Sequence, residues 1–276
     1  MNFIIIINYV FDLFFYPFYT IDPIYGLLAI SFITTVIMLP IFKYTSNQES
    51  IRRTKAKIIG HFLEIRLFKD DMRIVFSAQG NILKYNLLYL KSMLRPLCFV
   101  VWPVMIIMIQ TGMRYEYRPL RTGEVSIVKV KIENTKELTG KGSKGFLVSP
   151  EGLKIETPPL RVNGGGEEIY WRIKAEKEGV FDLRFQFSGI ELKKRVVVSN
   201  ALSKLAPKVS KEGFMGSFFY AGESLLDKDG CVEFFEVTYP QMKIMLFGWG
   251  FHWILIFFTL SLLFSFLLLR PFRVSI

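Results

Sequence analysis

Residues 25–43 read YGLLAISFITTVIMLPIFK, an apolar run that contains a short hydroxyl stripe and ends in a proline, two apolar residues and a lysine. About 20 predominantly apolar residues are enough for a helix to cross the hydrocarbon core of a bilayer. Asp22 and Pro23 precede the run, and these residue types are preferred at the N-cap and the first position of a helix. The sequence therefore predicts a first transmembrane span over residues 23–44.

The composition of the whole chain also indicates a membrane protein. Of its 276 residues, 51% are hydrophobic, and the mean hydropathy is +0.33. The formal charge of +11 could indicate a nucleic-acid-binding protein. However, the basic residues stand mainly beside the apolar runs, where the positive-inside rule predicts them. We therefore expect membrane lipids, and not DNA, as partners.

Residues 45–93 follow the first span and are basic and helical in pattern. From Lys43 to Arg95 there are eleven Lys or Arg and four Asp or Glu, which predicts a cytoplasmic segment. Apolar residues recur at helical spacing on both sides of Phe68–Asp71, and Asp70 or Asp71 can cap a second helix. We expect a coiled-coil-like helical hairpin. Its basic contact surface comprises Arg52, Arg53, Lys55, Lys57 and Arg66.

Two further spans are predicted, over residues 94–113 and 244–270. The span over residues 94–113 contains Pro96 and Pro103, which indicate a kinked membrane helix. The second begins with aromatic residues between Phe247 and Trp253, as in an outer interfacial belt. A basic cytoplasmic tail follows at residues 271–276. Residues 1–22 suit a helix lying along the membrane, because Asn8 and Asp12 interrupt the apolar run, but a true span is the alternative.

Residues 114–200 change to period-two patterns, which are typical of strands. Alternating segments lie at 125–132, 168–173, 181–187 and 192–198, and glycine-containing turns are expected at 163–166, 178–179 and 188–189. This spacing predicts an extracytoplasmic, immunoglobulin-like β-sandwich without a disulfide, with Trp171 in its core. Residues 201–243 are expected to form a connector with one or two short helices. The predicted fold class is a membrane α-helical bundle with an inserted β domain.

The sequence offers little for covalent chemistry. It has two histidines, no nucleophile elbow, no P-loop, no dinucleotide fingerprint and no metal-ligand cluster. We therefore expect no enzyme activity, no metal and no cofactor.

Polar residues inside the predicted spans are more informative. Ser31, Thr34 and Thr35 share one helix face because they stand at i, i+3 and i+4. A simple explanation is that small hydroxyl residues help membrane helices to pack. Together with polar residues of the other spans they could instead line a mildly polar groove that receives a chain segment. The predicted groove residues are Ser31, Thr34, Thr35, Gln110, His252 and Thr259.

Two stretches of the chain carry a family resemblance. Residues 31–40, SFITTVIMLP, resemble the TFIVRGIMYP stretch of the YidC/Oxa/Alb membrane-protein insertases, and residues 95–103 resemble their proline-rich next span. The three-span plan is similar to reduced members, such as archaeal YidC-like proteins and the third subunit of the ER membrane complex. Residues 43–48 and 66–71 also resemble a group of bacterial membrane proteins without assigned function.

The resemblance implies a protein of the bacterial inner membrane that helps nascent membrane proteins to insert, with the ribosome as a further partner. The family's groove arginine would fall at Thr35, which carries no charge, so the resemblance does not extend to handling of a substrate by charge attraction. The alternative is a membrane-anchored adaptor whose β-sandwich binds an envelope protein. An adaptor needs no polar stripe in its spans, whereas an insertase needs no exterior sandwich.

Overall fold

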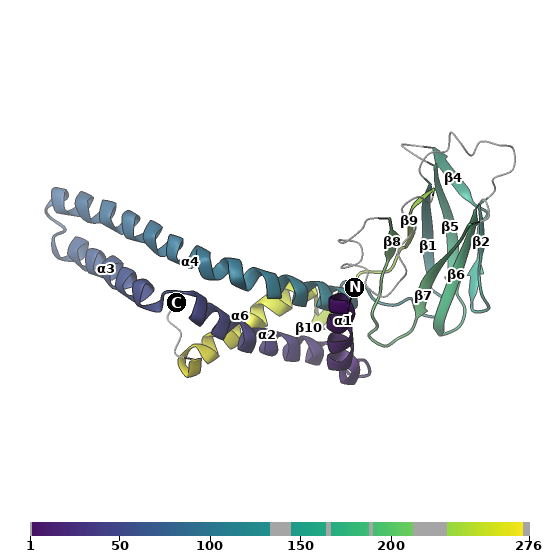
Figure 1. Ribbon diagram of the computed structural model, residues 1–276, viewed down its shortest axis with the longest axis horizontal. Coiled ribbons are helices and arrows are strands. Elements are labelled where there is room, and N and C mark those ends of the chain that lie inside the picture. Colours follow the sequence, from purple (N-terminus) through teal and green to yellow (C-terminus); the bar gives the residue numbers. More distant parts are fainter. Residues whose placement is uncertain (1, 133–144, 164–166, 188–189, 212–230, 273–276) are drawn as a thin grey trace. The chain divides into compact units, whose positions relative to one another are not determined.

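Helices and antiparallel strands alternate along the chain in large blocks (Figure 1). The computed structural model describes residues 2–132, 145–163, 167–187, 190–211 and 231–272. The chain divides into two compact units, residues 1–26 with 109–253, and residues 27–108 with 254–276. The helical elements are α1 (Asn2–Phe15), η1 (Tyr16–Phe18), α2 (Pro23–Thr45), α3 (Gln48–Leu67), α4 (Met72–Tyr115) and α6 (Trp253–Phe272).

Three of the described helices, α2, α4 and α6, are long and apolar enough to cross a membrane. This indicates a membrane protein. Helix α2 begins where the sequence predicts, and the Ile24 backbone N–H donates to the Asp22 carboxylate at 3.0 Å. Helix α1 is apolar but shorter than the three.

The segment after α2 forms two helices, α3 and α4, as predicted. The Asn47 side chain accepts from the Ser50 N–H at 2.9 Å and caps α3. Asp71 accepts from the Arg73 N–H at 2.9 Å and caps α4. Helices α3 and α4 lie side by side (Figure 1), and the rings of His61 and Tyr85 stack at 5.6 Å.

Helix α4 differs from the expectation of a hairpin helix followed by a separate span. It runs without interruption for 44 residues and includes both Pro96 and Pro103. Proline is tolerated inside long apolar helices because neighbouring groups can satisfy the carbonyls that it frees. One continuous helix thus joins the hairpin to the predicted second span.

The β domain has two antiparallel sheets. One sheet has the order β3-β5-β1-β9-β8, with β4 also paired to β5, and the other has the order β2-β6-β7. Within the described residues, its nine strands are β1 (Val125–Ile132), β2 (Phe146–Val148), β3 (Leu153–Ile155), β4 (Leu160–Asn163), β5 (Glu167–Ala175), β6 (Gly179–Phe187), β7 (Ile190–Val198), β8 (Lys208–Ser210) and β9 (Val232–Val237). The four segments with alternating patterns thus coincide with β1, β5, β6 and β7.

One hydrophobic core joins the inner faces of the two sheets. Trp171 on β5 is 3% exposed and meets Phe185 on β6 edge to face, with ring centroids 5.7 Å apart. Phe235 on β9 contacts the same Phe185 ring at 6.2 Å. Trp171 is therefore a core residue, as predicted. The immunoglobulin-like topology stays a prediction.

Two expected boundaries differ from the structure. The connector predicted at 201–243 contributes β8 and β9 to the larger sheet, so the β domain extends to Val237. The helix expected from residue 244 begins only at Trp253, because β10 (Ile244–Leu246) and β11 (Trp249–Phe251) form a hairpin before it. Short β segments of mostly apolar residues resemble a helix start in composition, which explains the error.

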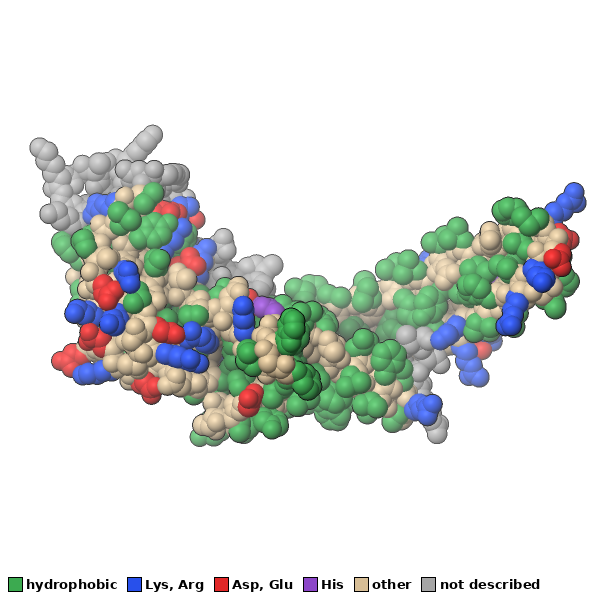
Figure 2. Space-filling view, turned by 180° about the vertical axis from the view of Figure 1, so that it is seen from behind, with side chains coloured by type: hydrophobic (Ala, Val, Ile, Leu, Met, Phe, Trp, Pro, Cys, Tyr) green, Lys and Arg blue, Asp and Glu red, His purple; other side chains and the backbone are tan. Residues whose placement is uncertain are grey.

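Some expectations lie outside the described residues. These are the turns at 164–166 and 188–189, any short helix within 212–230, and the tail beyond Phe272. In the described part, hydrophobic side chains cover much of the helices, whereas charged side chains gather on the β domain and around the turn between α3 and α4 (Figure 2).

Candidate functional site

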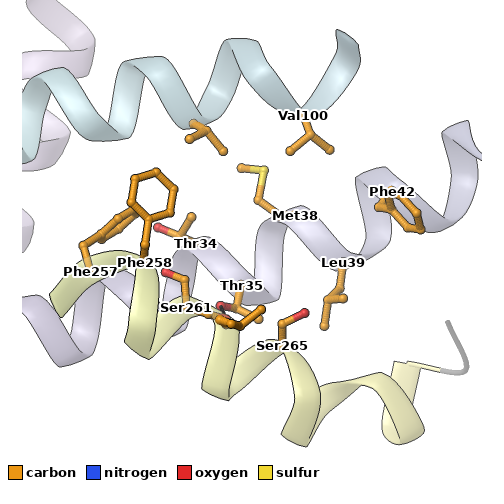
Figure 3. A pocket seen from close by; sticks show the side chains of 12 residues that line it. Thr34, Thr35, Met38, Leu39, Phe42, Val100, Phe257, Phe258, Ser261 and Ser265 are labelled. Carbon is orange, nitrogen blue, oxygen red and sulfur yellow. Dashed lines mark hydrogen bonds between the residues drawn. The ribbon is translucent and has the colours of Figure 1, made fainter. Parts of the chain in front are cut away.

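A cavity of about 410 Å³ lies between helices α2, α4 and α6 (Figure 3). Its wall is almost wholly apolar apart from four hydroxyl residues. The lining residues are Thr34, Thr35, Met38, Leu39, Phe42, Val100, Val104, Phe257, Phe258, Ser261, Leu262 and Ser265. Helix periodicity places Thr34, Thr35 and Met38 on one face of α2, and this face forms one wall.

The hydroxyl groups of α2 are bonded mainly within their own helix. Thr34 Oγ1 donates to the Ile30 carbonyl at 2.6 Å, and Thr35 Oγ1 lies 2.9 Å from the Ser31 carbonyl. Each threonine is 4% exposed. Such back-bonding satisfies the hydroxyl and leaves mainly the methyl group to face a cavity. The α2 wall is therefore less polar than its sequence suggests.

The same hydroxyl stripe also joins α2 to α6. Ser31 Oγ donates to the Phe257 carbonyl at 3.4 Å, and Thr35 Oγ1 lies 3.2 Å from the Ser261 carbonyl. Small residues allow helices to approach closely enough for such bonds. The stripe therefore helps α2 and α6 to pack, which was one alternative, and two of its residues also line the cavity. That the cavity receives a chain segment stays a prediction.

Ser261 and Ser265 on α6 are cavity residues that the sequence analysis missed. They stand at i and i+4, the spacing that identified the stripe of α2, so the same signal was present. The Ser261 hydroxyl is buried and has no hydrogen-bond partner among the described residues. The hydroxyl is thus enclosed by the protein and stays unsatisfied among those residues.

The other three predicted groove residues lie elsewhere. Thr259 is exposed on α6 and does not line the cavity. His252 precedes α6, and its Nε2 lies 3.4 Å from the Glu116 carboxylate. Gln110 belongs to the other unit of the chain, where its amide donates to Asn8 Oδ1 at 2.9 Å. The predicted six-residue groove is thus reduced to the α2 stripe, of which Thr34 and Thr35 line the cavity.

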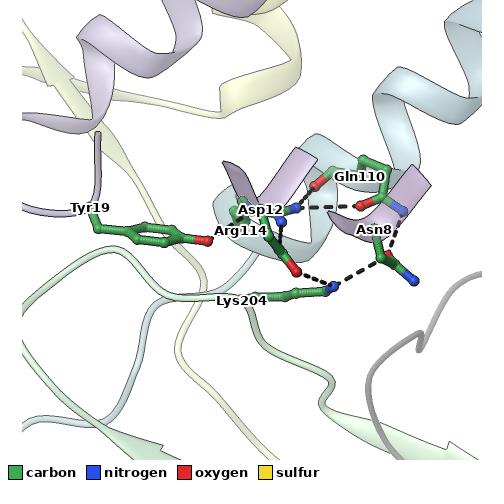
Figure 4. A network of polar contacts seen from close by, with 6 residues as sticks. All are labelled: Asn8, Asp12, Tyr19, Gln110, Arg114 and Lys204. Carbon is green, nitrogen blue, oxygen red and sulfur yellow. Dashed lines mark hydrogen bonds and ion pairs between the residues drawn. The ribbon is translucent and has the colours of Figure 1, made fainter. Parts of the chain in front are cut away.

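A second polar cluster surrounds Arg114, whose side chain is fully buried near the end of α4 (Figure 4). Its guanidinium pairs with the Asp12 carboxylate of α1 and donates to the Gln110 carbonyl at 2.7 Å. The guanidinium also lies 4.9 Å from the centre of the Phe15 ring. This role of Arg114 was not predicted from the sequence, although Asn8 and Asp12 interrupt the apolar run of residues 1–22.

Lys204 adds a second cation to the Arg114 cluster. Its ammonium lies 3.4 Å from Asp12 Oδ2 and 3.2 Å from Asn8 Oδ1. Burial lowers the pKa of Lys204, and the nearby positive charge of Arg114 acts in the same direction, while Asp12 opposes them. One carboxylate therefore holds two cations, and it ties α1 to both α4 and the segment between β7 and β8.

The five basic residues of the predicted contact surface are all exposed on α3. Arg53 pairs with Glu49 one turn earlier at 2.8 Å, and the Lys57 ammonium lies 4.9 Å from the centre of the Tyr85 ring. The other members are Arg52, Lys55 and Arg66. Their charges face outward, which suits either solvent or an anionic surface.

Comparisons with protein-family models, curated proteins and solved structures find no match for this chain. Among the residues that the structure describes, no group of three His, Cys, Asp or Glu side chains could hold a metal ion.

Proposed function

We propose that α2, α4 and α6 cross a bacterial inner membrane, with the α3–α4 turn in the cytoplasm and the β domain outside. The support is the charge distribution. Lys43 stands near the end of α2, Arg270 near the end of α6, and exposed basic residues cover α3. The positive-inside rule assigns all three to the same side.

We further propose that the protein assists the insertion or assembly of membrane proteins, as its resemblance to YidC/Oxa/Alb insertases implies. The cavity between α2, α4 and α6 is the observation that supports this function most directly. It would receive a segment of a client chain, and no covalent chemistry is needed. The exposed basic face of α3 would meet the ribosome, the nascent chain or anionic headgroups.

The wall of the cavity indicates which kind of segment it holds. Its threonine hydroxyls are already bonded to backbone carbonyls, and it carries no charged side chain. Burying an unpaired charge there would be unfavourable. We therefore propose an apolar client helix as the occupant.

Site-specific photocrosslinking in cells tests this function. A photoreactive amino acid fits better at Ser265, which lines the cavity and is partly exposed, than at the buried Thr35. After a short pulse of labelled amino acids, Ser265 should capture newly made membrane proteins. Phe266, the next residue on α6, is 65% exposed and does not line the cavity, so it is the matched control and should capture mainly lipid. Equal capture of clients at both positions would count against the cavity.

The adaptor function is a second candidate, and it has its own supporting observation. Strand β2 is at the edge of its sheet, and its apolar residues Phe146 and Val148 are 59% and 46% exposed. Exposed apolar edge strands can pair with another chain. A crosslinker at Phe146 that captures one stable envelope protein, together with a silent Ser265, would favour this function.

A further inference from the structure

The hairpin of β10 and β11 is the most exposed apolar feature among the described β elements. Its three backbone pairs are Ile244 with Phe251, Met245 with Gly250, and Leu246 with Trp249. Phe247 is 99% exposed, Trp249 73% and Met245 67%. No charged residue occurs from Ile244 to Phe251. A soluble surface seldom presents so many large apolar side chains together without a function.

The turn of the hairpin is built with an unfavourable residue. Phe247 and Gly248 both have positive φ, at 53° and 84°. Two-residue turns of this kind normally use Asn-Gly, Asp-Gly or Gly-Gly, because a bulky side chain is strained at positive φ. Exposing the Phe247 ring to water is unfavourable and does not compensate for the backbone strain. Such an observed outlier is a reason to expect a function at the tip.

The base of the hairpin is tied to the ends of two apolar helices. The Met242 backbone N–H donates to the Glu116 carbonyl at 3.0 Å, just after α4 ends. Trp253, the first residue of α6, donates its indole N–H to the Glu116 carboxylate at 2.7 Å. Wherever the ends of α4 and α6 reach the membrane surface, the hairpin starts at that level.

We propose that the β10–β11 hairpin inserts its tip into the interfacial layer of the bilayer, where α4 ends and α6 begins. Phe247, Trp249 and Met245 would enter the boundary between headgroups and acyl chains, which aromatic residues favour. The depth is limited because the outer backbone edges of a two-stranded hairpin stay unpaired, and hydrocarbon cannot satisfy them. This proposal rests on the membrane placement proposed above.

Depth-dependent quenching in liposomes tests the hairpin. The full-length chain with Cys98→Ser and Cys231→Ser carries a single cysteine, labelled with an environment-sensitive fluorophore, in phosphatidylcholine–phosphatidylglycerol vesicles. The test position is Phe247→Cys, and Trp249→Cys is a second variant if the first folds poorly. The matched water-exposed control is Phe146→Cys on β2, and the membrane control is Leu263→Cys on α6, whose side chains are 59% and 53% exposed.

We expect nitroxides on headgroups and shallow acyl positions to quench Phe247→Cys at least as strongly as Leu263→Cys. Deep nitroxides should quench only Leu263→Cys. The hairpin proposal is overturned if Phe247→Cys behaves like Phe146→Cys while Leu263→Cys is quenched. It is also overturned if Phe247→Cys is shielded from water but not quenched by lipid, since that indicates a protein contact. If Leu263→Cys itself is not quenched, the membrane placement has failed, and the hairpin proposal with it.

Discussion

At the scale of single residues, Thr35 shows that the partner of a side chain matters as much as its type. Its sequence position suggests a polar groove residue, but its hydroxyl lies within bonding distance of the carbonyls of Ser31 and Ser261. Arg114 shows how partners can also allow a charged side chain to be buried. It follows the apolar core of α4 and is nonetheless fully buried, because Asp12 and the Gln110 carbonyl satisfy its charge and its donors.

The Arg114 cluster predicts a strong effect of Asp12→Asn. This change removes the carboxylate that pairs with both Arg114 and Lys204, so a buried guanidinium loses its counter-charge. We expect a loss of about 1–3 kcal/mol of stability, the range for leaving a buried group unsatisfied. Thermal unfolding of the full chain in detergent measures it. Asp70→Asn, at the exposed turn between α3 and α4, is the control, and an equal shift in both variants would contradict the prediction.

The ion pair of Arg118 and Glu124 predicts a pH dependence. Hydrogen bonds from Arg118 lower the pKa of Glu124 from 4.5 to about 2. A carboxyl whose pKa is lower in the folded state stabilises the fold above its unfolded pKa. That stabilisation is therefore complete above pH 4.5 and is lost as the pH falls toward 2.

The Glu124→Gln variant isolates this contribution to the pH dependence. Above pH 4.5 it should unfold at a lower temperature than the unmodified chain, and the difference should shrink as the pH approaches 2. Circular dichroism of both chains across this window measures the difference. A gap that stays constant with pH would show that the carboxylate charge contributes nothing.

At the scale of elements, close approaches between helices depend on small residues. A Cβ added at Gly26 of α2 would clash with the Tyr115 hydroxyl of α4. Tyr115 is fully buried, and its hydroxyl donates to the Pro23 carbonyl at 3.0 Å. The Tyr115 side chain therefore packs against the start of α2, and it can do so only because residue 26 has no side chain.

Gly26→Ala should destabilise the protein by about 1–3 kcal/mol, as overpacking usually does. Because the clash is with a hydroxyl oxygen, Gly26→Ala combined with Tyr115→Phe should be more stable than Gly26→Ala alone. Gly60→Ala is the control, since nothing lies within 4 Å of a Cβ there. Thermal unfolding of the unmodified chain, Gly26→Ala, Tyr115→Phe and the double variant tests the coupling, and strictly additive effects would argue against the contact.

The cavity between α2, α4 and α6 predicts a functional effect without loss of folding. Val100→Trp would place an indole in the cavity, because Val100 lines it. Val101 is the next residue on α4, is 41% exposed and does not line the cavity, so Val101→Trp is the control. Insertion of client proteins should fall to the level of cells lacking the protein for Val100→Trp and stay normal for Val101→Trp. Equal detergent extraction and unfolding temperatures of the two variants exclude a folding defect, and normal insertion by Val100→Trp would contradict the proposed groove.

At the scale of the whole molecule, the alternation of apolar helices and a polar β domain predicts a fixed orientation. Single cysteines at Asp70, in the turn between α3 and α4, and at Glu151, in the turn between β2 and β3, report the two sides. In a chain with Cys98→Ser and Cys231→Ser, a membrane-impermeant maleimide should label Glu151→Cys in intact cells and Asp70→Cys only after lysis. Labelling of Asp70→Cys in intact cells would show that the protein has the opposite orientation in the membrane.

Features that depend on a local pattern could be predicted from the sequence. Long apolar runs gave α2 and the central part of α6, Asp22 and Asp71 capped the expected helices, and period-two alternation located β1, β5, β6 and β7. These signals are local because hydrophobic periodicity and capping act within a few residues.

Which polar groups face a cavity, and which already have hydrogen-bond partners, depends on how the whole chain folds. No local pattern shows whether the hydroxyl of a threonine faces a groove or bonds to its own helix. Thr35 lines the cavity, but its hydroxyl bonds to the Ser31 carbonyl of its own helix. Likewise, the burial of Arg114 depends on Asp12, which is 102 residues away in the chain. Charge pairing and cavity formation arise from residues distant in sequence, so only the folded chain brings them together.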